Sequence, residues 1–139
     1  MGMVELDIDY RPSDDEPFMN DRQKQYFANK LEAWKAEILE ESKSTIVALQ
    51  DQSSKMPDAA DRASSETDRS IELRARDRQR KLITKIDAAL KRIQEGTYGY
   101  CEETGEPISL QRLDARPIAT LSIEAQERHE RREKIYRDD

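Results

Sequence analysis

Two carboxylates stand three residues apart in the stretch KMPDAADRAS, which occupies residues 55–64. Asp58 and Asp61 follow Pro57 and enclose two alanines. Side chains three positions apart on a helix face the same way, so the pair could approach a bound Mg²⁺ or the polar groups of a partner's catalytic loop. A simpler interpretation is that Asp58 caps a helix and Asp61 favours the helix dipole. No histidine or cysteine nearby completes an acid–base set, so we do not interpret the pair as catalytic.

A basic segment follows this acidic pair. Residues 62–92 contain ten Lys or Arg and five Asp or Glu, so the segment carries +5 within a chain of net charge −6. Arg78, Lys81, Leu82 and Lys85 fall on adjacent helical turns. Guanidinium and ammonium groups bind phosphate or an acidic protein surface. The alternative is a solvated helix face whose cations pair with glutamates of a neighbouring helix.

Two long helices must position these residues. Residues 20–53 contain neither proline nor glycine, and Asn20 with Gln23 resembles a capping box. The first helix carries a stripe of apolar residues at spacings of four, three and four. The second helix, which runs from Asp58 to Glu95, carries a similar apolar stripe. The stripes are formed by Phe27, Leu31, Trp34 and Ile38 and by Leu82, Ile86, Leu90 and Ile93. Both stripes lie far from Pro57, so the pattern predicts an antiparallel coiled-coil hairpin over residues 20–95 with its tip at 56–63.

The rest of the chain predicts three smaller parts. Residues 1–19 are acidic and contain two prolines, which indicates a flexible tail. Residues 96–121 hold three glycines and two prolines, which is typical of a small loop-rich globular base. Ser122 is a suitable N-cap for a C-terminal helix over residues 122–139. The expected fold class is therefore mainly α.

Composition excludes several classes of protein. Charged residues make up 39% of the 139 residues, and the net negative charge argues against a general affinity for nucleic acid. The basic face is narrow and carries no recognition motif, which argues against sequence-specific DNA binding. A single cysteine, Cys101, rules out an internal disulfide and suits a reducing compartment. Neither a secretory signal nor a membrane-spanning run is present. We expect a cytoplasmic monomer.

The sequence resembles the DksA/TraR family of bacterial RNA polymerase regulators. The resemblance rests on PDAADRAS, on LRARDRQRKLITKI and on YGYCEETGEPISLQRLDARPIATLSIEAQ, and it extends over residues 18–136. It implies a coiled-coil hairpin that enters the secondary channel of RNA polymerase and brings its tip to the active site. It also implies that the alarmone ppGpp binds between regulator and polymerase. The expected outcome is repression of promoters such as those of ribosomal RNA and activation of amino-acid biosynthesis promoters.

The resemblance also assigns residues. It places Asp58, Asp61 and Ala63 at the tip, near the polymerase active site. The ppGpp- and polymerase-binding positions that it implies are Arg78, Lys81, Leu82, Lys85 and Arg116. One further contact of the family is usually lysine, whereas this chain has Gln126.

Many family members fold their base around zinc held by two C-x-x-C pairs. The four matching positions in this chain are Cys101, Thr104, Ser122 and Ala125. Tetrahedral zinc sites are built from thiolate and imidazole ligands, and three of these positions offer neither. The sequence therefore predicts a degenerate zinc finger without metal. Its base would be held together by apolar side chains, namely Ile108, Leu110, Leu113, Ile118, Leu121 and Ile123.

Other functions stay open at this point. A coiled-coil adaptor or scaffold without polymerase binding is the main alternative, and it predicts that the tip acids are dispensable while Leu31 and Leu82 are essential. Stimulation of transcript cleavage fits less well, because proline and alanines surround the acids. An enzyme or metal-binding module is disfavoured by the missing ligand and catalytic sets.

Overall fold

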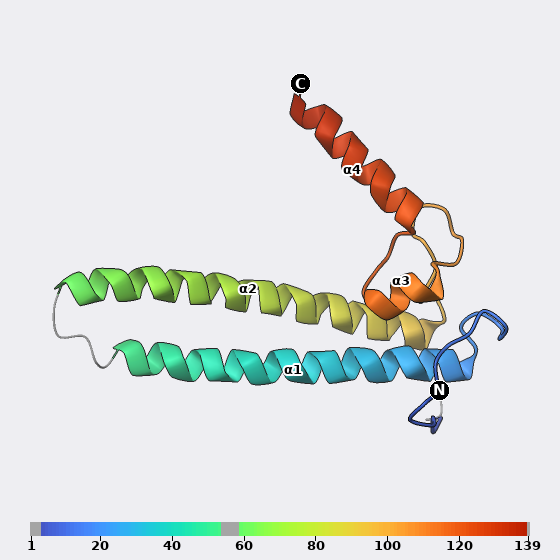
Figure 1. Ribbon diagram of the computed structural model, residues 1–139, viewed down its shortest axis with the longest axis horizontal. Coiled ribbons are helices and arrows are strands. Elements are labelled where there is room, and N and C mark those ends of the chain that lie inside the picture. Colours follow the sequence, from blue (N-terminus) through green and yellow to red (C-terminus); the bar gives the residue numbers. More distant parts are fainter. Residues whose placement is uncertain (1–3, 54–58, 139) are drawn as a thin grey trace. The chain divides into compact units, whose positions relative to one another are not determined.

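The computed structural model describes residues 4–53 and 59–138 of the chain. Four helices make up most of it: α1 (Asp21–Ser53), α2 (Ala59–Glu95), α3 (Leu110–Ala115) and α4 (Ile123–Asp138) (Figure 1). The chain divides into two compact units. Unit 1 comprises Met1–Leu31 and Ala88–Asp139, and unit 2 comprises Glu32–Asp87.

Unit 2 is an antiparallel helix pair, which confirms the predicted hairpin. The Nζ atom of Lys35 on α1 lies 2.7 Å from Oδ1 of Asp87 on α2. Farther toward the tip, the Oγ atom of Ser42 lies 2.8 Å from Oε1 of Gln79. Ile38 is buried in the seam of this helix pair, as predicted. The seam is thus apolar at one end and polar where Ser42 meets Gln79.

The predicted helix ends are also present. The Oδ1 atom of Asn20 accepts a hydrogen bond of 2.9 Å from the backbone N–H of Gln23. At the other end of the hairpin sequence, α2 stops at Gly96, whose φ of +80° is one that glycine adopts without strain. The N–H of Thr97 donates to the carbonyl of Arg92 and that of Gly96 to Ile93, which is a Schellman motif.

Unit 1 has a small apolar core. Tyr98 is almost fully buried, its ring centroid lies 5.6 Å from that of Phe27, and its hydroxyl donates to the carbonyl of Pro117 at 2.7 Å. Leu31, Ile108 and Leu113 are buried beside them in the same unit. One predicted core residue is misplaced: Ile123, the first residue of α4, is 48% exposed.

The base contains a helix that the sequence did not predict. Six residues form α3, and the Oγ atom of Ser109 caps it by accepting the N–H of Arg112 at 3.2 Å. A single antiparallel bridge joins Tyr100 and Pro107 in the preceding turn. The segment is therefore a tight turn and one short helix within the small loop-rich base that the sequence predicted.

The N-terminal segment differs from the flexible tail expected for residues 1–19. Tyr10 is buried, and its hydroxyl donates to the carboxylate of Glu16 at 3.0 Å. The buried amide of Gln23 accepts the N–H of Met19 at 2.8 Å and donates to the carbonyl of Ser13 at 3.1 Å. Hydrogen bonds thus tie the described part of this segment to the start of α1.

The last helix, α4, begins where the sequence predicts. The Oγ atom of Ser122 accepts the N–H of Ala125 at 3.2 Å. The carboxylate of Glu103 in the base lies 2.8 Å from Nε2 of His129 on α4. It also accepts a hydrogen bond of 3.3 Å from Nη2 of Arg128 on the same helix. Among the described helices, none has the length and apolar character to cross a membrane.

Candidate functional site

The acidic tip lies at the margin of the described chain. Asp58 is outside the described residues, and α2 begins at Ala59. Asp61 and Ala63 belong to the first turns of α2, but their side chains are also outside the described part. The role predicted for these three residues therefore stays a prediction.

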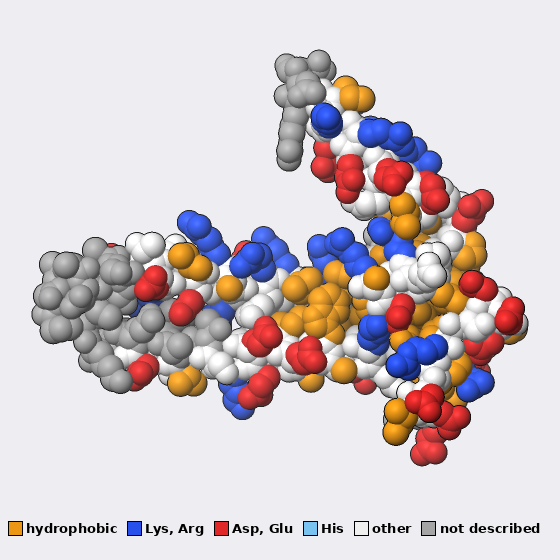
Figure 2. All heavy atoms as spheres, in the orientation of Figure 1, with side chains coloured by type: hydrophobic (Ala, Val, Ile, Leu, Met, Phe, Trp, Pro, Cys, Tyr) orange, Lys and Arg blue, Asp and Glu red, His pale blue; other side chains and the backbone are white. Residues whose placement is uncertain are grey.

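A basic stripe runs along the exposed side of α2 in unit 2. It consists of Arg74, Arg78, Lys81 and Lys85, which are spaced by four, three and four residues and are all exposed. Side chains at these spacings lie one above the other on a helix. Figure 2 shows lysine and arginine side chains gathered along the edge of α2. The sequence predicted three of these cations, and Arg74 adds a fourth one turn closer to the tip.

The carboxylate of Asp77 pairs with part of the positive charge on this side of α2. Asp77 accepts from Nη2 of Arg80 at 2.7 Å and lies 3.1 Å from Nζ of Lys81. The hydrogen bonds from Arg80 and Lys81 hold the pKa of Asp77 below its usual value. Arg74, Arg78 and Lys85 have no ion-pair partner among the described residues. These three cations are thus available to an external anion.

Apolar side chains border the stripe. Ile71 and Leu73 are 56% and 47% exposed, and they line an open hollow on α2 with Arg74 and Arg78. Leu82, which the resemblance assigned to the same site, is half-buried. A partner that meets this part of unit 2 would need both acidic and apolar groups.

Arg116 lies in unit 1 and follows α3. Its side chain is exposed, whereas its backbone is held at both ends. The N–H of Arg116 donates to the carbonyl of Arg112 at 2.7 Å, and its carbonyl accepts the N–H of Ala119 at 3.0 Å. Gln126, which stands where the family usually has lysine, is half-buried and donates to Glu130 at 3.2 Å.

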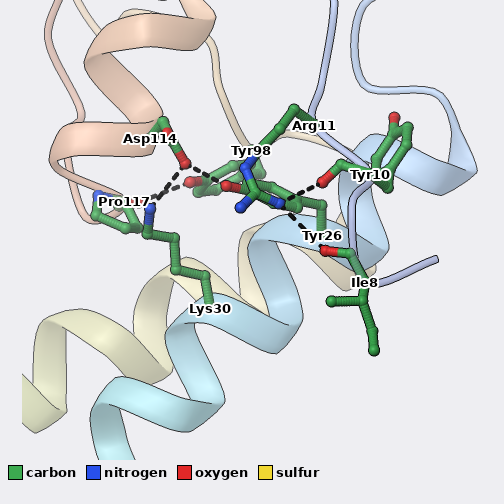
Figure 3. Close-up of polar contacts among 8 residues, drawn as sticks. All are labelled: Ile8, Tyr10, Arg11, Tyr26, Lys30, Tyr98, Asp114 and Pro117. Atoms are coloured by element: carbon green, nitrogen blue, oxygen red, sulfur yellow. Dashed lines mark hydrogen bonds and ion pairs between the residues drawn. The ribbon is translucent and has the colours of Figure 1, made fainter. Parts of the chain in front are cut away.

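A polar cluster that the sequence did not predict holds α3 against α1 in unit 1. The Oδ1 atom of Asp114 accepts from the hydroxyl of Tyr26 at 2.5 Å and from Nζ of Lys30 at 2.7 Å. Figure 3 shows both donors converging on this carboxylate, with Arg11 of the N-terminal segment close by. Partners more than 80 residues apart leave no local pattern, so no sequence signal could have revealed this cluster.

The pKa values in this cluster fit its hydrogen bonds. Burial and the hydrogen bond to Asp114 raise the pKa of Tyr26 to about 12. Partial burial raises the pKa of Asp114, but the hydrogen bonds from Lys30 and Tyr26 outweigh it and keep this pKa below its usual value. At neutral pH, Asp114 is therefore a carboxylate and Tyr26 a neutral donor.

The turn around Cys101 is built to hold a thiolate. The Cys101 N–H donates to the carbonyl of Glu106, and the Gly105 N–H donates to the carbonyl of Cys101, both at 2.8 Å. Burial raises the pKa of the thiol. Hydrogen bonds from the Thr104 side chain and from the backbone of Ser122, Thr104 and Glu103 more than offset this, and the pKa falls to about 6.

Comparison with known proteins identifies the class first. Residues 23–93 match the family model of the DnaK suppressor protein DksA, N-terminal domain, and residues 96–131 match the prokaryotic dksA/traR C4-type zinc finger. In the structure, too, a pair of long helices is followed along the chain by a small base that contains α3. The chain belongs to the DksA family.

Individual relatives agree with this assignment. The chain is 70% identical over 131 residues to a Caulobacter vibrioides protein named RNA polymerase-binding transcription factor DksA, covering 94% of this chain and 92% of the relative. A Haemophilus influenzae protein of the same name is 45% identical, covering 90% and 86%. The solved structure of transcription factor DksA2 from Pseudomonas aeruginosa is 44% identical, with a TM-score of 0.79 over 84% of this chain and 90% of that one.

The prediction that this base is a zinc finger without metal is wrong. The matched family is a C4-type zinc finger, a class of domain in which bound zinc is part of the fold. The count of cysteines at the four matching positions takes no account of the turn that carries them, in which hydrogen bonds lower the pKa of Cys101 to about 6, and the thiolate is the form of cysteine that binds metal.

The donor set itself does not complete a four-cysteine site. Thr104 donates to the sulfur of Cys101, Ser122 caps α4, and Ala125 offers no donor atom. Among the residues that the structure describes, no group of three or more His, Cys, Asp or Glu side chains could hold a metal ion. Of the four positions, only Cys101 thus supplies a thiolate.

Proposed function

We propose that this protein is a transcription factor that binds RNA polymerase. The observation that carries the proposal is its 70% identity, over nearly its whole length, to a relative named for that activity. The protein acts by binding and not by catalysis, as a monomer in the cytoplasm, and it does not read DNA sequence itself.

The hairpin supplies the mechanism. It enters the secondary channel of the polymerase and brings Asp58, Asp61 and Ala63 close to the active site, where two carboxylates compete for polar groups or for Mg²⁺. The basic stripe on α2 contacts acidic groups of the polymerase or phosphates of ppGpp. Three exposed cations without a described partner support this part of the proposal. Transcription initiation is altered as a result, with repression at ribosomal promoters and activation at promoters of amino-acid biosynthesis.

Transcription in vitro tests the tip. We expect the wild-type protein to repress a ribosomal RNA promoter with purified polymerase, and ppGpp to strengthen this repression. Asp61→Asn should bind polymerase with unchanged affinity and repress at least about tenfold less, because it removes charge at the tip without altering the docking surfaces. Asp68→Asn is the matched control, since Asp68 is an exposed acid farther along α2. Equal activity of Asp61→Asn and wild type would refute the role of the tip.

Charge reversal tests the basic stripe. Arg78→Glu should weaken polymerase binding, and the loss should shrink at high salt because exposed charge interactions are screened. Lys91→Glu is the control, since Lys91 is also exposed on α2 but lies outside the stripe. A purified protein with no affinity for polymerase would refute the proposal as a whole and favour a scaffold function.

A further inference from the structure

Arg116 projects from a segment whose orientation depends on tertiary contacts. It directly follows α3, which has six residues. A helix this short has little stability of its own, so its neighbours determine where its last turn points. The Arg116 side chain is exposed and has no partner among the described residues, whereas its backbone is fixed by two hydrogen bonds.

The last turn of α3 is fixed to α1 by Asp114. Tyr26 and Lys30 lie four residues apart on one face of α1, and both donate to the same oxygen of Asp114, at 2.5 and 2.7 Å. Charge-assisted hydrogen bonds of this length are among the strongest side-chain interactions. Asp114 stands two residues before Arg116, so this contact acts close to the base of the arginine side chain.

The surrounding contacts make the cluster rigid. The Tyr26 ring stands edge-on to Phe27, with centroids 5.1 Å apart, and Lys30 lies over the Tyr26 ring at 5.8 Å. Arg11 adds a second cation near the carboxylate, and its guanidinium donates to the Tyr10 carbonyl at 2.8 Å (Figure 3). Asp114 therefore joins α3 to an ordered part of unit 1.

We propose that Asp114 is a positioning residue that fixes the backbone from which Arg116 reaches the phosphates of ppGpp. The inference rests on the proposed function, because it assumes that ppGpp acts through this protein. Asp114 does not touch the alarmone, and the hairpin does not depend on it for docking. Removing its carboxylate frees the last turn of α3 and spreads Arg116 over many orientations, which raises the entropic cost of binding the anion.

The experiment is a ppGpp titration of transcription from a ribosomal promoter, with polymerase affinity measured separately in the absence of ppGpp. Asp114→Ala removes the contact with α1, and Asp114→Glu keeps a carboxylate that can still reach both donors. Asp87→Ala is the matched control, because it removes a carboxylate that also meets a lysine at 2.7 Å, but in unit 2.

We expect Asp114→Ala to need about tenfold more ppGpp for half-maximal repression, with ppGpp-independent polymerase affinity within twofold of wild type. Asp114→Glu and Asp87→Ala should respond as wild type does. Tyr26→Phe removes one of the two donors and should give an intermediate shift, which keeps the test decisive if Asp114→Ala folds poorly.

Two results would overturn the inference while leaving the proposed function intact. One is an unchanged ppGpp titration for both Asp114→Ala and Tyr26→Phe. The other is an equal loss of polymerase affinity with and without ppGpp, which would mean that Asp114 merely supports the fold. If ppGpp has no effect on the wild-type protein while polymerase binding persists, the ppGpp part of the proposed function fails, and this inference fails with it.

Discussion

The hydroxyl group of Tyr98 offers a sharp test of how the base is held together. The side chain is 1% exposed, and its hydroxyl donates to the carbonyl of Pro117 at 2.7 Å. Burial raises the pKa of Tyr98, so the group remains a neutral donor at any physiological pH. Tyr98→Phe keeps the ring in the core and deletes only this donor. The carbonyl of Pro117, itself a buried residue, is then left without its partner.

The expected cost follows from that unpaired carbonyl. A buried acceptor that loses its only donor costs about 1–3 kcal/mol, more than the net worth of an average hydrogen bond, because no water replaces the donor. Tyr98→Ala should cost more, roughly 3–5 kcal/mol, since it also leaves a cavity in the core. Urea denaturation followed by far-ultraviolet circular dichroism measures both free energies of unfolding, provided that the slope with denaturant is unchanged.

Tyr100 provides the control two residues away. It is 39% exposed, and its hydroxyl has no hydrogen-bond partner among the described residues. Tyr100→Phe should therefore change the free energy of unfolding by less than about 0.5 kcal/mol. If Tyr98→Phe and Tyr100→Phe proved equally stable, the hydroxyl of Tyr98 would not be holding the segment after α3, and this account of the base would be wrong.

Three further predictions test other parts of the fold in the same urea assay. Gly96→Ala should cost about 1 kcal/mol because of its φ of +80°. Gly99→Ala should cost more, because its Cβ would also lie 3.1 and 3.2 Å from two side chains of the N-terminal segment, and equal costs would count against that packing. Ile86→Ala should lose about 2–5 kcal/mol, whereas Leu39→Ala, 49% exposed on α1, should lose under about 0.5 kcal/mol. The raised pKa of Tyr26, about 12 against 10, adds stability that is complete below pH 10 and disappears as the pH rises through about 12. Because Tyr26 is partly exposed, this contribution to the free energy of unfolding amounts to about 1 kcal/mol. The Tyr26→Phe variant should therefore not show this loss of stability at alkaline pH.

The hairpin was predictable because its signals are local. Apolar residues at helical spacing, a cap at Asn20 and a terminator at Gly96 each lie within a few residues of the structure they specify. The structure confirms the caps and the buried seam, including Ile38 and Ile86. The role of the tip acids was implied by the family resemblance, since helix capping also explains the local sequence, and the transcription assay with Asp61→Asn tests that role.

The base was harder to predict because its contacts are distant in sequence. Tyr26 and Asp114 are 88 residues apart, and each looks like an ordinary surface residue until the fold brings them together. Ile123 was expected in the core from its apolar character alone, but its place at the start of α4 leaves it exposed. The contact between Tyr26 and Asp114 could not be anticipated from helix propensity, because it does not depend on neighbours in the chain.

The zinc prediction failed for a related physical reason. Counting donor atoms at Cys101, Thr104, Ser122 and Ala125 treats a metal site as a set of ligands, whereas a finger is also a turn whose backbone N–H groups point at sulfur. That turn survives here: hydrogen bonds from Thr104 and from nearby backbone groups offset the burial of the Cys101 thiol and bring its pKa to about 6. Family membership therefore follows the backbone that presents the ligands at least as closely as the ligands themselves.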